Sequence, residues 1–346
     1  MSLVILMIEK HARKVKALIV IILLLAALGG YLLLQRVAPS GAGLHQVRVA
    51  DVRFLGSAPI YAALEKNLFR QEGIEVSHAF FWVGKEALKA VIEGKADIGT
   101  VADYPIAMEA LKGRKISVIA TIARQSRTHS IVALKQYNIS SPKDLADKNI
   151  GVSLGTNGHF ILDSFLLYHK VPEGRVRLVD LTADGMAEAL KKGQIQAAIL
   201  WGPPLARLIR QLGDKAVVFD GDEQQIYTQT WNLVATDEYI RKNPEDVKRV
   251  LRALSTACAF IKEHGEESLA IATKYSEMEP GAARETWQRV KLALSLNPLL
   301  IENLENEARW AVKKELTSGG QIPNFLDYIS FNGLESVAPG EVTIIH

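Results

Sequence analysis

The chain has 346 residues, of which 48% are apolar and 23% are charged. This length usually divides into more than one core, and the composition excludes disorder as the main state. The formal charge is +3 and the isoelectric point about 8.7. Five basic residues and one acidic residue lie in positions 1–44, so the rest of the chain is close to neutral. A nucleic-acid-binding domain needs a basic face, which a near-neutral folded part does not favour, so we expect no nucleic-acid partner. The single cysteine, Cys258, excludes an internal disulfide.

The N-terminal segment carries a long apolar run. Residues 17–34 are uncharged and mostly apolar, and as a helix they span about 27 Å, close to the roughly 30 Å hydrocarbon core of a bilayer. The basic residues before this run predict that residues 1–16 form a cytoplasmic tail and that everything after residue 34 is extracytoplasmic. We therefore expect a transmembrane anchor at 17–34 and a spacer at 35–45. A cleaved signal peptide is the alternative.

The rest of the chain alternates short β-rich runs with helical segments up to Asn243 and Pro244, and residues 245–319 then look almost wholly helical. This alternation is typical of βαβ units around a parallel sheet. The expected strands are 47–53, 74–80, 96–101, 116–121, 130–134, 149–153, 176–179, 197–201 and 216–219. The expected helices are 59–67, 85–93, 103–111, 142–146, 158–169, 184–192 and 203–212.

The alternation contains an internal repeat. Residues 94–105 and 193–204 both run from a glycine after a helix, through a buried strand, to a proline at the next helix start. Two similar α/β lobes in tandem account for this repeat. Because ligands of open α/β sheets bind beyond the carboxyl ends of the strands, two such lobes predict a cleft between them.

Several motifs in fixed order resemble one family. These are Phe54 to Phe69 (FLGSAPIYAALEKNLF), residues 94–99 (GKADIG), 141–145 (SPKDL), 155–160 (GTNGHF) and 323–325 (PNF). Together they resemble the alkanesulfonate, taurine and nitrate substrate-binding proteins of ABC importers and their thiamine-pyrimidine-binding relatives. The resemblance covers nearly the whole chain after residue 46. It implies a two-lobed periplasmic-binding-protein type II fold, with two crossovers between the lobes.

This resemblance also implies how the chain is divided and what it does. Lobe 1 is expected at residues 46–124 plus 237–346, and lobe 2 at 125–236. The expected function is capture of a small organic anion for an ABC permease and its ATPase by a monomeric, membrane-tethered protein on the periplasmic side. The alternatives are a neutral aromatic ligand such as a thiamine-pyrimidine precursor, a tethered ligand-sensing domain and, less favoured, an enzyme on the same fold.

Candidate ligand-binding residues follow from helix starts and aromatic side chains near the expected strand ends. Helix N-termini carry free N–H groups and a positive dipole end, which suit anions, and aromatic rings suit the apolar body of a ligand. Arg124 is expected at the crossover into lobe 2, where its guanidinium could bind two oxygens of an anion. The full candidate set is Ser57, Trp82, Gly84, Thr100, Asp103, Tyr104, Arg124, Thr156, Asn157, His159, Phe160, Trp201 and Trp231.

Enzyme and metal motifs are weak in this sequence. Residues 151–155 (GVSLG) match a nucleophile-elbow pattern, but Ser153 would lie inside a strand rather than at the turn. The histidines show no paired metal spacing. Fungal pyrimidine synthases of this fold use a cysteine-rich motif, which a single cysteine cannot supply. We therefore expect no catalytic residue, no metal and no cofactor.

Overall fold

The structure is a computed structural model that describes residues 43–172, 174–221, 226–317 and 320–346. The cytoplasmic tail expected at 1–16, the anchor at 17–34 and most of the spacer at 35–45 lie outside the described residues. Within the described ranges, no helix has the length and apolar character that a membrane span requires. His45–His346 forms a compact unit by itself.

A six-stranded sheet organises the first lobe. Its order is β11-β4-β10-β3-β1-β2, and β10 runs antiparallel to both of its neighbours. The strands β1, β2 and β3 are parallel, and β11 pairs antiparallel with β4 at the edge. The strands are β1 (His45–Val52), β2 (Ile74–Phe81), β3 (Ile98–Ala102), β4 (Ile116–Gln125), β10 (Gln229–Thr236) and β11 (Val290–Ser295).

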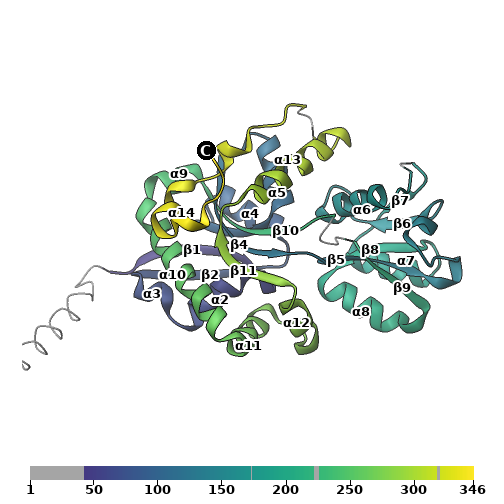
Figure 1. Cartoon of the computed structure of the whole chain (residues 1–346), viewed down its shortest axis with the longest axis horizontal. Coiled ribbons are helices and arrows are strands. Elements are labelled where there is room, and N and C mark those ends of the chain that lie inside the picture. The colour runs from purple at the N-terminus through teal and green to yellow at the C-terminus, as the bar shows by residue number, and fades with distance from the viewer. Residues whose placement is uncertain (1–42, 173, 222–225, 318–319) are drawn as a thin grey trace, which may run out of the picture. The chain divides into compact units, whose positions relative to one another are not determined.

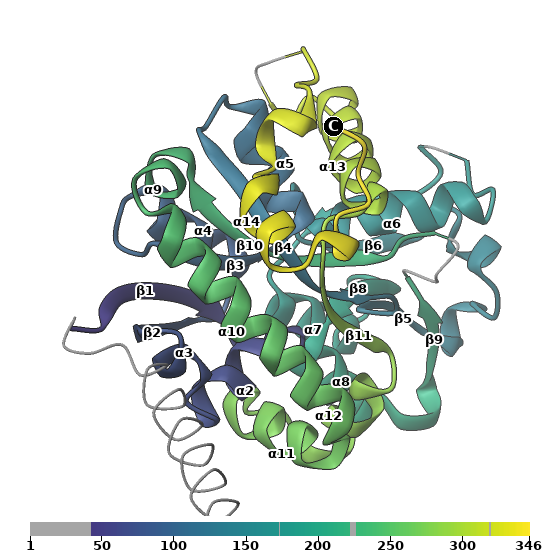
Figure 2. The ribbon, with the colours of Figure 1, turned by 60° about the vertical axis from the view of Figure 1, so that its left-hand side comes forward.

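Helices cover both faces of this sheet. Because βαβ crossovers are right-handed, α2 lies on the face opposite to α4 and α5. The helices α10 and α11 pack against α2 (Figure 2), and α13 packs against α5 (Figure 1). The helices are α2 (Ala58–Glu65), α3 (Leu68–Gln71), α4 (Gly84–Ile92), α5 (Asp103–Leu111), α9 (Asp237–Lys242), α10 (Pro244–Glu263), α11 (Gly265–Ser276), α12 (Pro280–Trp287), α13 (Pro298–Lys313) and α14 (Phe331–Val337).

The second lobe has a five-stranded sheet of order β7-β6-β8-β5-β9, in which β5 runs antiparallel to β8 and β9. Phe165 on α6 and Ile150 on β6 are buried in a core on one face, and Met186 on α7 and Leu208 on α8 in a core on the other. The elements are β5 (His129–Leu134), β6 (Asn149–Val152), α6 (Asn157–Tyr168), β7 (Arg177–Asp180), α7 (Ala183–Lys191), β8 (Ala197–Trp201), α8 (Gly202–Leu212) and β9 (Ala216–Asp220).

The two-sheet α/β architecture confirms the expected fold, with three differences in detail. The strand β10 was not predicted, and its pairing with β3 and β4 places residues 229–236 in the first sheet rather than in lobe 2. The strand β11 interrupts the region expected to be wholly helical. Pro142–Leu145 forms a short 3-10 helix, η3, capped by Ser141. The return connection between the sheets therefore lies at 221–228, before the boundary expected after residue 236.

Candidate functional site

The carboxyl ends of the parallel strands in the two sheets face the same junction. The chain leaves the first sheet at the end of β4 and enters the second at the start of β5, where His129 pairs with Trp201 at the end of β8. Since β4 runs in the same direction as β1 and β3, this connection joins the carboxyl-terminal edges of both sheets (Figure 1). Ligands of open α/β sheets bind at such edges. We call the region where these edges meet the junction.

On the first-lobe side of the junction, a buried carboxylate gathers three of the predicted residues. Asp51, which is fully buried at the end of β1, accepts hydrogen bonds from the hydroxyls of Ser57 (2.6 Å) and Thr100. The indole Nε1 of Trp231 donates to Ser57 Oγ at 2.9 Å. His78 Nε2 lies 3.3 Å from the second oxygen of Asp51. The hydroxyl hydrogens of Ser57 and Thr100 are therefore engaged within the lobe, and Trp231 is fixed in place.

A second buried network surrounds Asp103 at the start of α5. Its carboxylate accepts hydrogen bonds from the backbone N–H and hydroxyl of Thr230 (3.0 and 3.1 Å), from Asn303 Nδ2 (2.7 Å) and from the hydroxyl of Tyr227. Burial raises the pKa of Asp103, and these hydrogen bonds oppose that rise. With this many partners, Asp103 holds α5, α13 and β10 together. Its carboxylate has no free oxygen to offer a ligand.

The N-terminus of α6 is the open helix start of the second lobe. The Thr156 hydroxyl donates to the Ser153 carbonyl at 2.6 Å instead of capping the helix. Within the described chain, no hydrogen bond engages the backbone N–H groups of Asn157 and Gly158. A helix of 12 residues carries about half a positive charge at this end. The start of α6 therefore offers two donors to an anion.

Two predicted residues of the first turn of α6 point toward the first lobe. His159 is buried, its Nδ1 accepts from the Gly155 N–H, and its ring packs edge-on against Trp310 of α13 at 4.8 Å. Phe160 contacts the same indole at 5.5 Å. Burial lowers the pKa of His159, so its ring is neutral near pH 7. These two side chains contact the first lobe through Trp310, whereas Tyr104 of α5 packs edge-on against Trp310 within the first lobe, at 5.9 Å.

Aromatic and aliphatic side chains are exposed at the strand ends of both lobes. Trp82 follows β2 and is 70% exposed, and Trp201 ends β8 and is 39% exposed. Val83 and Leu154 beside them are also exposed. The Trp201 ring lies near the start of α6, because a Cβ on Gly158 would come within 3.7 Å of its Cζ3. Exposed apolar groups at both edges of the junction are available to an apolar ligand body.

Arg124 and Trp231 lie on opposite faces of the first sheet. Arg124 is directly opposite Thr230 on β10 and Lys291 on β11, whereas Trp231 is opposite Ala123. Residues directly opposite each other share a face, and successive residues alternate. Since Thr230 contacts Asp103 and Trp231 contacts Ser57, Arg124 lies on the α5 face and Trp231 on the α2 face. The two side chains predicted to hold one ligand therefore approach the junction from different sides.

Gly84, the last of the predicted residues, begins α4. A Cβ there would meet Val101 Cγ2 at 3.1 Å, so its role in the structure is the close packing of α4 on β3. Five further residues near the junction were not predicted from the sequence: Asp51, Gln125, His129, Gln229 and Trp310. Burial lowers the pKa of His129 to about 3, and its ring lies 5.3 Å from that of Trp201. Polar residues at or near the ends of predicted strands were the available signal for Asp51, Gln125 and His129, whereas Gln229 begins β10, a strand that was not predicted.

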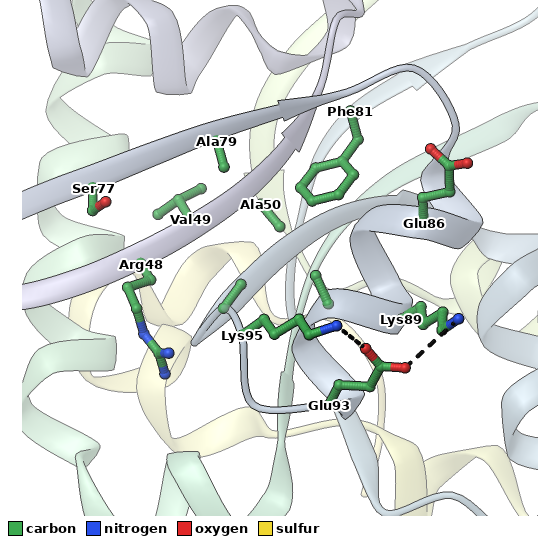
Figure 3. A pocket seen from close by; sticks show the side chains of 12 residues that line it. Arg48, Val49, Ala50, Ser77, Ala79, Phe81, Glu86, Lys89, Glu93 and Lys95 are labelled. Atoms are coloured by element: carbon green, nitrogen blue, oxygen red, sulfur yellow. Dashed lines mark hydrogen bonds and ion pairs between the residues drawn. The ribbon is translucent and has the colours of Figure 1, made fainter.

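Two hollows lie elsewhere on the first lobe. One, of about 430 Å³, lies beside β1, β2 and α4 and is lined by Ala50, Ala79 and Phe81, with Lys89 and Lys95 bonded to Glu93 at its rim (Figure 3). The other, of about 460 Å³, lies between α10 and β11 and includes Cys258. In the part of the chain that the structure describes, no group of three or more His, Cys, Asp or Glu side chains could hold a metal ion.

Two α/β lobes whose strand ends meet at a junction define a protein with the periplasmic-binding-protein fold. The chain belongs to the NMT1/THI5-like family, whose model matches residues 55–268. A Bacillus subtilis protein named for binding aliphatic sulfonates is 24% identical over 265 residues, which are 75% of this chain and 78% of that protein. Among solved structures, the periplasmic aliphatic sulphonate binding protein SsuA of Escherichia coli superposes with a TM-score of 0.69 at 18% identity, covering 82% of this chain and 97% of SsuA.

The same fold also carries an enzyme. The desulfurization enzyme DSZB superposes with a TM-score of 0.64 at 15% identity, covering 86% of this chain and 99% of that enzyme. The fold alone therefore does not distinguish a binding protein from an enzyme, and the distinction must be argued from the residues at the junction.

Proposed function

We propose that this protein is an extracytoplasmic solute-binding protein that captures a small organic anion, such as a sulfonate, at the junction and delivers it to an ABC permease and its ATPase. The observation that carries the proposal is the open start of α6, where the N–H groups of Asn157 and Gly158 lie beside the partly exposed ring of Trp201. An anionic group suits the helix start, and an apolar body suits the ring.

Family and relatives support this reading. The Bacillus subtilis relative and the Escherichia coli structural neighbour are both named for binding aliphatic sulfonates. Such ligands combine an anionic head with an apolar chain, which is the chemistry that the start of α6 and Trp201 suit. Asp103 and the Asp51 network supply rigid walls rather than a reacting group, so we propose a binding protein without catalytic turnover.

We further propose that residues 17–34 tether the folded part to the cytoplasmic membrane. The apolar run and the basic residues before it support an uncleaved anchor with its N-terminus in the cytoplasm. Expression of the full chain and of a form starting at residue 43 tests this directly. The full chain should stay in the membrane fraction after carbonate washing, and the shorter form should be released. Release of the full chain would contradict the anchor.

Ligand capture is tested by mass spectrometry of small molecules that copurify with the full chain, followed by calorimetric titration with sulfonates, nitrate, carboxylates and pyrimidines. The Trp201→Ala variant should bind the best ligand about 10- to 150-fold more weakly, because it loses one apolar contact worth about 1.5–3 kcal/mol. Leu167→Ala is the matched control, since Leu167 is exposed at the far end of α6. Equal losses in the two variants, or conversion of the ligand to a product, would contradict the proposal.

A further inference from the structure

The first sheet ends in a strand with one open side. β11 is the last strand in the order of that sheet, and β4 pairs with only one of its sides. Just after β11, the C-terminal segment pairs with the other side. The backbone N–H of Leu296 donates to the Glu341 carbonyl, and the N–H of Thr343 donates to the Leu296 carbonyl, both at 2.8 Å. In the described chain, no strand continues this parallel pairing along residues 290–294. We call this side of residues 290–294 the free edge.

An apolar groove lies beside the free edge. Its volume is about 460 Å³, and Figure 2 shows the two elements that form it, α10 and β11, next to each other. Its apolar lining comes from α10, α12 and β11: Ala259, Ile261, Trp287, Val290, Leu292 and Leu294. Its charged lining residues, Lys262 and Glu341, have opposite signs. An extended peptide that paired with the free edge would place every second side chain on the side of this groove.

The other face of the same strand is basic. Lys291 on β11 lies directly opposite Arg124 on β4, and residues directly opposite each other share a face. Leu292 lies opposite Ala123, so it is on the α2 face with Trp231, and the two cations are on the α5 face. Lys291 is exposed and Arg124 half-buried, and within the described ranges neither side chain has an ion pair or a hydrogen bond. Like charges directly opposite each other destabilise a sheet, so this pair favours an acidic neighbour.

A second copy of this chain suits the free edge poorly. If two β11 strands paired antiparallel about a two-fold axis perpendicular to the sheet, Lys291 and Arg124 of both copies would lie on one face of the joined sheet. Four cations would then repel one another. Lysine on an edge strand is a common protection against such self-pairing. The charges therefore favour a different partner, one that carries acidic side chains.

We propose that the free edge binds an extended segment of a partner protein in which apolar side chains alternate with acidic ones. The segment adds a strand to the first sheet along residues 290–294. Its apolar side chains enter the groove between α10 and β11, and its acidic side chains lie on the face of Lys291 and Arg124. This binding does not use the open start of α6, so it holds or fails independently of the proposed function.

Fluorescence anisotropy with synthetic peptides tests the proposal on the full chain in mild detergent. The probe is a seven-residue peptide that alternates valine with glutamate. One control has lysine in place of glutamate, and the other has the same composition with the glutamates grouped together. We expect the alternating acidic peptide to bind at least about tenfold more tightly than either control, because only this peptide matches both the basic face and the apolar groove. Similar binding of either control, or no binding of the acidic peptide, would overturn the proposal.

Charge reversal at Lys291 tests the role of the basic face. Lys291→Glu should weaken binding of the acidic peptide about tenfold and strengthen binding of the lysine peptide, because a cross-strand attraction becomes a repulsion. Lys192→Glu, at an exposed position of the second lobe, is the matched control and should change neither affinity. Thermal unfolding checks each fold, and Lys291→Gln replaces Lys291→Glu if the latter does not fold. An unchanged preference for the acidic peptide would overturn the proposal.

Backbone methylation separates strand addition from attraction between charges alone. Because N–H groups of successive residues in a strand point to opposite sides, the valine N–H groups of the bound peptide face one side and the glutamate N–H groups the other. Of two peptides, one N-methylated at the valines and one at the glutamates, one should bind at least about tenfold more weakly than the unmodified peptide. Undiminished binding of both would overturn strand addition. A full chain that sediments as a dimer, which the acidic peptide dissociates, would assign the free edge to a second copy and overturn the choice of partner.

Discussion

Two carboxyl groups share one phenol in the interior of the first lobe, and their burial predicts an unusual dependence of stability on pH. Asp103 and Glu307 are both fully buried, and the Tyr227 hydroxyl contacts both, with Glu307 Oε1 at 3.0 Å. Glu307 Oε2 has no partner. Burial is the largest cause that raises the pKa of Glu307, and the charge of Asp103 raises it further. Burial also raises the pKa of Asp103.

The sign of the effect follows from proton binding. The pKa of Glu307 lies well above its usual value in the folded protein, so the folded state holds a proton that the unfolded state has already released. Stability therefore falls as pH rises above the unfolded value of about 4.3, and the fall continues up to the raised pKa. One extra bound proton gives a slope of about 1.4 kcal/mol per pH unit. Gln at position 307 keeps the shape and cannot ionise, so Glu307→Gln should remove up to this slope.

Urea unfolding followed by tryptophan fluorescence between pH 5 and 8 measures the effect. The free energy of unfolding of Glu307→Gln should change less with pH than that of the wild type, and the variant should gain relative stability toward pH 8. Glu302→Gln, at an exposed position on the same helix, should leave the wild-type slope unchanged. Equal slopes for wild type and Glu307→Gln would refute the reasoning, because they would mean that Glu307 ionises alike in the folded and unfolded states.

Three further predictions concern the anchor, the lobes and Arg124. A form of the chain starting at residue 43 should sediment as a soluble monomer, and its aggregation would show that the N-terminal segment belongs to the fold. Asp163→Asn should weaken the contact between α6 and α13, because Trp310 Nε1 and Lys314 Nζ both bind Asp163, at 2.9 and 2.8 Å. Small-angle scattering of this variant without solute should then show a larger radius of gyration than that of the wild type. An unchanged radius would contradict the role of this contact. Arg124→Ala should weaken solute binding less than about threefold in calorimetry, because Arg124 lies on the α5 face, and a loss of tenfold or more would return it to the ligand site.

The alternation of strands and helices was predictable because the signals are local. Buried strands such as β3 and β8 are short apolar runs between glycine turns and helix starts, and these signals lie within about ten residues of each other. β11 was missed because Leu and Ala, which also favour helices, fill a six-residue strand inside a helical region. β10 was missed because Gln, Thr and Asn occupy half of its positions. β11 pairs with β4, and β10 pairs with β3 and β4, all of them distant in the chain, and such distant pairing overrides local propensity.

The candidate site likewise has features that local sequence predicts and features that depend on distant strand pairing. The open start of α6 was predictable from the Gly155–Gly158 turn, which is a local feature. The positions of Arg124 and Trp231 on different faces depend on the register between β4 and β10, strands more than 100 residues apart in the chain. A shift of one residue in that register would exchange the two faces. No property of the sequence near Arg124 or Trp231 carries this information. The prediction therefore placed in one candidate site two side chains that lie on opposite faces of the sheet.

The helix starts that carry predicted residues differ in their hydrogen bonding. In the first lobe, Ser57 before α2 and Asp103 at the start of α5 are bound by internal hydrogen bonds from Trp231, Thr230 and Asn303. The start of α6 in the second lobe keeps two N–H groups without partners among the described residues, and so does the start of α4 in the first lobe, at Gly84 and Lys85. A pre-ordered wall loses little conformational entropy when a solute arrives, and an open helix start gains most from an anion. Under the proposed function, the anionic group of the solute would therefore bind at an open helix start, and the networks of Asp51 and Asp103 would form the pre-ordered wall. Affinity then depends on how closely the two lobes meet, which the contact of Asp163 with Trp310 and Lys314 controls from the side of α13.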